Sequence, residues 1–222
     1  MTEIEWLACD DPHQLLDEHP HPLSDRKLRL LGCACARRLW GFLKPVDRTA
    51  VEVTERYVDG NATGWKLARA HRDAHDAYIE NTGDASYDNA ATAITSMSDP
   101  RETHLAVAFD KAAGAFAFEA ENEEVDWDDA YREETARQVI LLRDVVGNPF
   151  RPVTFSTAWR SDTAVSLAKG MYESRDFAAM PILADALQDA GCDDEDVLNH
   201  CRDEKGVHVR GCWVVDAVLG RA

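Results

Sequence analysis

A chain of 222 residues is long enough to bury a substantial core, and 45% hydrophobic with 29% charged residues is ordinary for a folded globular protein. The formal net charge of −17 argues against nucleic acid or an anionic membrane as the main partner, because such surfaces attract clustered positive charge. The sequence has no apolar run long enough to cross a bilayer and no signal-peptide pattern at its N-terminus. We therefore expect a cytoplasmic protein.

Helical signals follow one another along the first two thirds of the chain. Ser24 is expected to cap a long helix that runs to about Leu43 and ends before Pro45. Leu28, Leu31 and the residues that continue their spacing form one apolar stripe with the period of an α-helix. The other long helices that this period predicts cover residues 46–59, 62–80, 101–122 and 127–146.

The C-terminal third is expected to form short helices, because capping residues, prolines and glycines divide it at close intervals. Nowhere does the sequence alternate like a strand over more than a few residues. It therefore predicts an all-α bundle of about eight to ten helices, with no substantial sheet. We expect a single domain over residues 1–222, in which the helices of 1–146 pack with those of 153–222.

Cysteines and histidines gather near the C-terminus. In a reducing compartment the six cysteines are expected to be thiols or metal ligands rather than disulfides. Cys192, Cys201, His208 and Cys212 together supply the soft donors that zinc prefers. His208 and Cys212 are four residues apart at the expected start of the last helix, which would place them on one face. His200 is an alternative to Cys201 as a ligand.

Core packing explains the same cysteines without a metal. Asp193 is expected to cap the helix 194–202, which makes Cys192 and Val197 a hydrophobic pair at its start. Cys201 continues the inward face of that helix, and Cys212 belongs to the apolar stripe of the last one. The sequence also lacks the CxxC knuckle that most zinc sites contain. Metal binding is therefore the alternative interpretation.

One acid and one basic helix are the remaining anomalies. Asp216 falls at a buried position of the last helix, so we expect it to pair with an arginine, for which Arg37, Arg143 and Arg151 are candidates. The first long helix carries most of the positive charge in an acidic protein. Its arginines are expected to pair with internal acids, or else to form a docking face for an acidic or phosphorylated partner; they are Arg26, Arg29, Arg37 and Arg38.

Several stretches at the two ends of the chain resemble a family of uncharacterised proteins from planctomycete-type bacteria. The stretches are MTEIEWLACDDP, SDRKLRLLGCACARRLW, AVEVTERYVDG, LLRDVVGNPFRPV, MPILADALQDAGC and HCRDEKGVHVRGCWVVDAVLG. Residues 62–125 carry no such resemblance. The family has no assigned activity, so the resemblance implies a bacterial, cytoplasmic, helical module and no site residue.

The function predicted from the sequence is a non-catalytic helical interaction or adaptor module that binds a protein partner. It is favoured because the chain lacks a nucleophile elbow, a phosphate loop and an HExxH motif. The alternative is a zinc-binding or thiol-based protein that uses the C-terminal cysteines and histidines. An enzyme built from scattered histidines such as His71, His75 and His104 ranks last.

Overall fold

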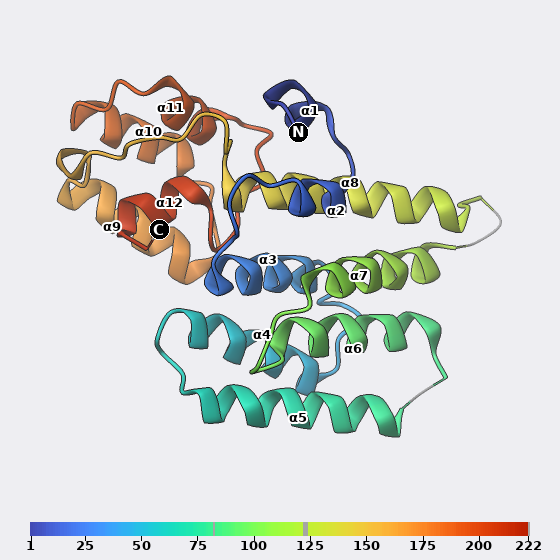
Figure 1. Ribbon diagram of the computed structural model, residues 1–222. Coiled ribbons are helices and arrows are strands. Elements are labelled where there is room, and N and C mark those ends of the chain that lie inside the picture. Colours follow the sequence, from blue (N-terminus) through green and yellow to red (C-terminus); the bar gives the residue numbers. More distant parts are fainter. Residues whose placement is uncertain (82, 122–123, 222) are drawn as a thin grey trace. The chain divides into compact units, whose positions relative to one another are not determined.

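The computed structural model describes residues 1–81, 83–121 and 124–221. Within these ranges it contains twelve α-helices, a short 3-10 helix and no strand, which confirms the predicted all-α class (Figure 1). The chain divides into two compact units, Met1–Ile140 and Leu141–Ala222, each of which is described by itself. The packing of both ends into one domain stays a prediction.

Eight helices begin in the N-terminal unit, and the last of them continues into the C-terminal unit. They are α1 (Glu3–Ala8), α2 (Pro12–Asp17), α3 (Asp25–Arg38), α4 (Pro45–Val58), α5 (Gly64–Glu80), α6 (Ala85–Ser98), α7 (Leu105–Ala120) and α8 (Trp127–Val146). The other elements of the C-terminal unit are η1 (Thr157–Trp159), α9 (Asp162–Ser174), α10 (Met180–Asp189), α11 (Glu195–Arg202) and α12 (Trp213–Leu219).

The helices begin where side chains can satisfy the free amide groups of a first turn. Thr2 and Glu5 form a capping box on α1, and the Ser24 hydroxyl accepts from the amide of Lys27 in α3. Pro45 opens α4, where its missing N–H costs nothing. The starts of α3 and α4 agree with the sequence-based expectation to within one residue.

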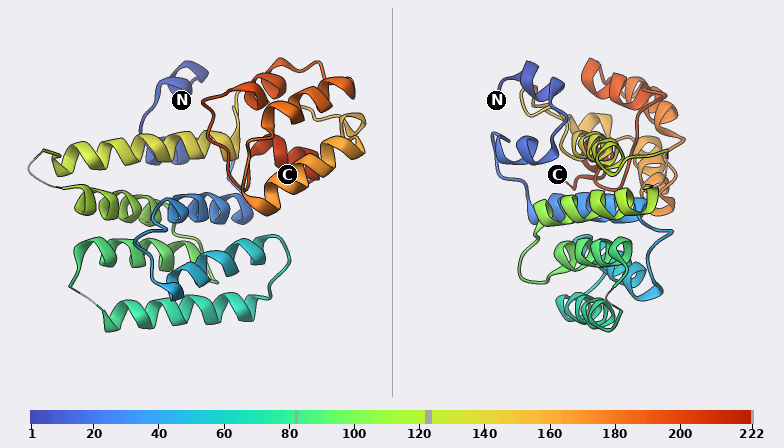
Figure 2. Two further views of the ribbon diagram at one scale, coloured as in Figure 1. Left: turned by 180° about the vertical axis from the view of Figure 1, so that it is seen from behind. Right: turned by 90° about the vertical axis from the view of Figure 1, so that its right-hand side faces the viewer.

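The N-terminal unit is built in layers (Figures 1 and 2). α5 lies against α4 and α6, and these two lie against α3 and α7. Its interior holds large side chains with no exposed surface, among them Leu31, Ile94 and Phe109. Gly32 lets α3 approach α6 closely, because a β-carbon there would stand 2.7 Å from the β-carbon of Met97.

The basic residues of α3 pair with acids inside the N-terminal unit. Arg38 grips the carboxylate of Glu134 with two hydrogen bonds of 2.6 and 2.7 Å, and Arg37 holds Glu55 in the same two-pronged way. Arg26 pairs with Asp59. Arg29 is buried, and it contacts Asp25 and the carbonyl oxygen of Asp99. Internal pairing, the first of the two expectations, therefore accounts for all four arginines.

The C-terminal unit has its own hydrophobic core, formed by α9, α10, α11 and α12. Leu183, Leu187, Val197 and Val215 are fully buried there. α10 packs on both α9 and α11, while α12 packs on α9 (Figure 1). In the described part of the chain, no helix has the length and apolar character that a bilayer span requires.

Candidate metal centre

Four potential metal ligands from separate pieces of the C-terminal unit converge at one point. Asp144 lies in the last turn of α8, and His200 lies in α11. His208 lies in the segment 203–212 that connects α11 to α12, and Cys212 is the residue that precedes α12. One donor atom from each side chain lies within 4.8 Å of all the others.

The distances between the donor atoms match a small tetrahedral ion. His208 Nδ1 is 2.8 Å and His200 Nε2 is 3.3 Å from Asp144 Oδ1. The sulfur of Cys212 is 3.2 Å from His200 Nε2 and 4.0 Å from His208 Nδ1. Ligands of tetrahedral zinc are about 3.3–3.6 Å apart, as follows from bonds of about 2.0–2.3 Å. Shifts of about 1 Å or less would therefore bring these atoms onto an ion.

The local chain path, rather than a shared helix, brings His208 to Cys212. The predicted last helix starting near His208 is wrong, because α12 begins at Trp213. Residues 209–212 form a turn in which the Cys212 amide donates to the Val209 carbonyl at 2.9 Å. Gly211 has a φ of +95°, a backbone conformation that favours glycine over residues with a side chain. This conformation prevents a continuous helix from His208 into α12. A turn, rather than a helix, therefore brings His208 close to Cys212 across the four-residue spacing.

The cap of α11 also differs from the prediction by one residue. Asp194, rather than Asp193, accepts from the amide of Val197 at 3.1 Å. His200 and Cys201 follow in the last turn of this helix. His200 reaches the candidate metal centre, whereas Cys201 is directed into the hydrophobic core with Val197.

A second layer of contacts holds the donors in place. The Val209 amide donates to Asp144 Oδ2 at 2.9 Å, which leaves Oδ1 to face the histidines. The ring of Trp213 lies 5.1 Å from the ring of His200. Gly147 makes room for this indole, because a β-carbon there would stand 3.1 Å from its Cγ. The centre is therefore covered by packed side chains and backbone.

The centre is a buried acid surrounded by groups that can give up protons. Burial by itself would raise the pKa of Asp144, but hydrogen bonds from His200 and His208 outweigh burial and hold that pKa below its usual value. Burial, followed by the Asp144 charge, raises the pKa of the Cys212 thiol well above its usual value. The side chains of Asp144 and His208 are 3% and 6% exposed and that of His200 is 19% exposed, so the centre is largely buried.

Two members of the ligand set predicted from the sequence, His208 and Cys212, belong to this centre. Among the described residues, the converging group does not include Cys192 or Cys201, and both are buried in the core of the unit. Burial raises the pKa of Cys201 to about 12, as expected for a thiol that serves as a core side chain. His200 was considered as an alternative ligand, whereas Asp144 was missed.

Cys9 is more exposed to solvent than the other five cysteines. All six are free thiols, and five are buried, whereas Cys9, beyond the end of α1, is half-buried. The sulfur of Cys9 lies 3.4 Å from the carbonyl oxygen of Asp11. The cysteines of the candidate metal centre and of the core are therefore shielded from solvent.

Asp216 is buried in α12, as predicted, with 1% of its surface exposed. Of its three expected arginine partners, Arg37 pairs with Glu55 and Arg151 lies 3.9 Å from Asp196. The predicted ion pair of Asp216 with Arg143 stays a prediction. The acid lies one turn beyond Cys212, and its amide donates to the Cys212 carbonyl at 2.8 Å.

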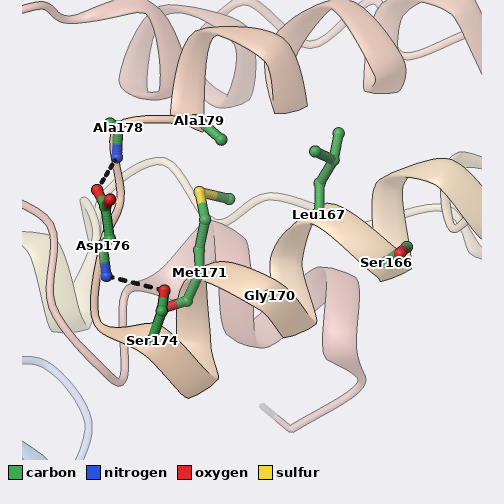
Figure 3. Close-up of a pocket in the computed structure, with 8 residues that line it drawn as sticks. All are labelled: Ser166, Leu167, Gly170, Met171, Ser174, Asp176, Ala178 and Ala179. Atoms are coloured by element: carbon green, nitrogen blue, oxygen red, sulfur yellow. Dashed lines mark hydrogen bonds between the residues drawn. The ribbon is translucent and has the colours of Figure 1, made fainter.

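Two surface hollows lie in the C-terminal unit. The first, of about 340 Å³, lies between α9 and the start of α10 (Figure 3). There the Asp176 carboxylate accepts from the Ala178 amide, and the Ser174 hydroxyl accepts from the Asp176 amide, so these polar groups are already used. The second, of about 440 Å³, is lined by His208 together with Asp176, Asp203 and Glu204.

Among the described residues of the N-terminal unit, the histidines do not form a comparable group. His71 Nδ1 lies 3.2 Å from the hydroxyl of Ser98, which is fully buried, while His75 and His104 are exposed.

Comparison of the chain with protein-family models, curated proteins and solved structures finds no significant match. The candidate metal centre therefore rests on its own geometry.

Proposed function

We propose that the C-terminal unit binds a zinc ion through Asp144, His200, His208 and Cys212. The observation that carries the proposal is the convergence of four donor atoms within 4.8 Å from four separate side chains. A thiol, two imidazoles and a carboxylate form a mixed set that suits zinc better than magnesium or calcium, which prefer oxygen ligands. Four protein ligands complete a tetrahedron, which is typical of structural zinc sites.

The test begins with protein purified without a chelator and without an affinity tag. Elemental analysis is expected to find about one zinc per chain, and a chromophoric chelator in competition gives the affinity. Replacing Asp144 with Asn, or Cys212 with Ala, should weaken binding at least tenfold. Unchanged zinc affinity in both variants would exclude this ligand set.

A matched control separates the two candidate ligand sets. Cys201→Ala makes the same chemical change as Cys212→Ala, at another fully buried position of the same core. The proposal expects Cys201→Ala to keep the zinc affinity. Loss of zinc in Cys201→Ala, with retention in Asp144→Asn, would favour the set first predicted from the sequence.

The interaction module predicted from the sequence is a separate proposal about the whole chain. The ion pairs of Arg26, Arg37 and Arg38 count against α3 as its docking face, because internal acids already hold these guanidinium groups. A pull-down with the full chain tests for a protein partner. Replacing the α3 arginines is expected to affect stability more than partner recovery.

A further inference from the structure

We infer that the bound metal acts as a reversible lock: it fastens residues 203–212 to α8 when it is bound, and it is not the folding nucleus of the C-terminal unit. This inference rests on the proposed zinc site and adds the role of the ion there. Two observations carry it: the segment 203–212 has no helix or strand and holds two of the four donors, His208 and Cys212, and the unit has a core and a hydrogen-bond network that do not need the ion.

The segment 203–212 has no helix or strand, and it crosses from the end of α11 to the start of α12. Asp144 anchors it, since one carboxylate accepts from the Val209 amide at 2.9 Å and contacts His208 Nδ1 at 2.8 Å. Arg210 donates to the carbonyl oxygens of Tyr172 and Glu173, and its guanidinium lies 4.9 Å from the Tyr172 ring centre. An ion held by Asp144, His208 and Cys212 would fasten this segment to α8 at two points.

The rest of the unit has its own source of stability. α9, α10 and α11 meet in a core whose members include Leu183, Leu187 and Val197, all fully buried. At the centre itself, Asp144 Oδ1 already contacts His208 Nδ1 at 2.8 Å and His200 Nε2 at 3.3 Å, and Oδ2 accepts from the Val209 amide. The carboxylate is therefore satisfied with or without an ion, in contrast to small zinc domains that unfold when the metal is removed.

The segment carries two basic residues that report its opening. Lys205 is exposed and Arg210 is half-buried, so both are potential trypsin sites. A protease must extend several residues around the cleaved bond, which requires local opening of the chain. A lock at His208 and Cys212 is expected to suppress that opening.

The experiment compares the full chain with zinc and with a chelator. Hydrogen exchange and trypsin cleavage are followed for peptides within 203–212, and bound zinc is measured in the same samples. Zinc should slow exchange and cleavage in this segment at least tenfold, while the α9 and α10 peptides change little. Asp144→Asn, which preserves the size of the side chain, should abolish the zinc effect, whereas Cys201→Ala should retain it.

The possible outcomes separate this inference from the zinc site. Zinc binding with unchanged exchange in 203–212 would overturn the lock and leave the site intact. Collapse of protection in α9, α10 and α11 on chelation would also overturn it, in favour of a folding nucleus. If no zinc binds at all, the proposed function and the lock both fall.

Discussion

Gly206 lies against the imidazole of His208, so that a β-carbon on Gly206 would stand 3.0 Å from Nε2 and 3.3 Å from Cε1. The same β-carbon would stand 3.0 Å from the carbonyl oxygen of Asp203. Only a residue without a side chain leaves the ring where Nδ1 can face Asp144. The position of His208 therefore depends on a neighbour that supplies no ligand atom.

Gly206→Ala is expected to weaken zinc binding at least tenfold and to leave the unit folded. The added methyl group must displace the ring or the 203–206 backbone, and either shift moves Nδ1 away from the other donors. Chelator competition measures the affinity, and circular dichroism checks the fold. Gly170→Ala is the matched control, because a β-carbon at Gly170 meets open space. Equal affinities in the two variants would contradict this role of Gly206.

Arg38→Ala is expected to destabilise the N-terminal unit by about 3 kcal/mol, because it leaves the buried carboxylate of Glu134 without its main partner. Glu134 is 1% exposed, and it depends on two hydrogen bonds from Arg38. Urea unfolding measures the change. Arg132→Ala, which removes only a surface pair with Asp129, should cost less than about 1 kcal/mol. Similar losses in free energy of unfolding for both substitutions would show that the buried Arg38–Glu134 pair stabilises the protein no more than a surface pair does.

Asp47→Asn is expected to stabilise the protein at neutral pH by about 1 kcal/mol, because a neutral amide of the same shape replaces a buried carboxylate charge. Asp47 has no exposed surface, and its Oδ1 has no hydrogen-bond partner, although Oδ2 accepts from the Lys44 amide. Burial therefore raises its pKa above the usual 3.8. Burial, followed by the Asp47 charge, also raises the pKa of Tyr87 to about 12.

The pH dependence of this effect has a definite sign. A raised carboxyl pKa means that the folded state binds the proton more tightly, so the penalty is absent below pH 3.8, grows between pH 3.8 and the folded pKa, and is constant above it. The advantage of Asp47→Asn in free energy of unfolding should therefore increase from acid to neutral pH. Glu52→Gln, at an exposed position of α4, is the control and should show no such trend. A constant difference across this range would refute the assignment.

Asp216→Ala is expected to lower the melting temperature, with a loss of about 3 kcal/mol, because it removes a buried carboxylate and leaves its predicted arginine partner unpaired. Asp216 is 1% exposed in α12 of the C-terminal unit. Thermal unfolding measures the change, with Asp193→Ala at an exposed position as the control. An unchanged melting temperature would reject the predicted ion pair.

Local patterns predicted the helices well, because helix caps and apolar periods act over a few residues. Ser24 and Pro45 mark the helix starts found in the structure. Ion-pair partners distant in sequence were harder to predict, since no residue near Arg38 in the sequence indicates Glu134, which lies 96 residues away. The described residues form twelve α-helices where about eight to ten helices were expected.

The candidate metal centre was half predictable. His208 and Cys212 are close in sequence, so their spacing was visible even though a turn, rather than the expected helix, brings them together. Asp144 lies in the run VILLRDVV of α8, and an acid among apolar residues is the same signal that singled out Asp216. Applied to α8, that signal would have found the missing donor, although not its partners.

The unequal burial of the six thiols has a practical consequence for spectroscopy. A maleimide-linked fluorophore or nitroxide should attach to the native protein mainly at Cys9, because the other five sulfurs are enclosed. The natural sequence thus offers a single attachment point, outside the C-terminal unit, without any cysteine being removed.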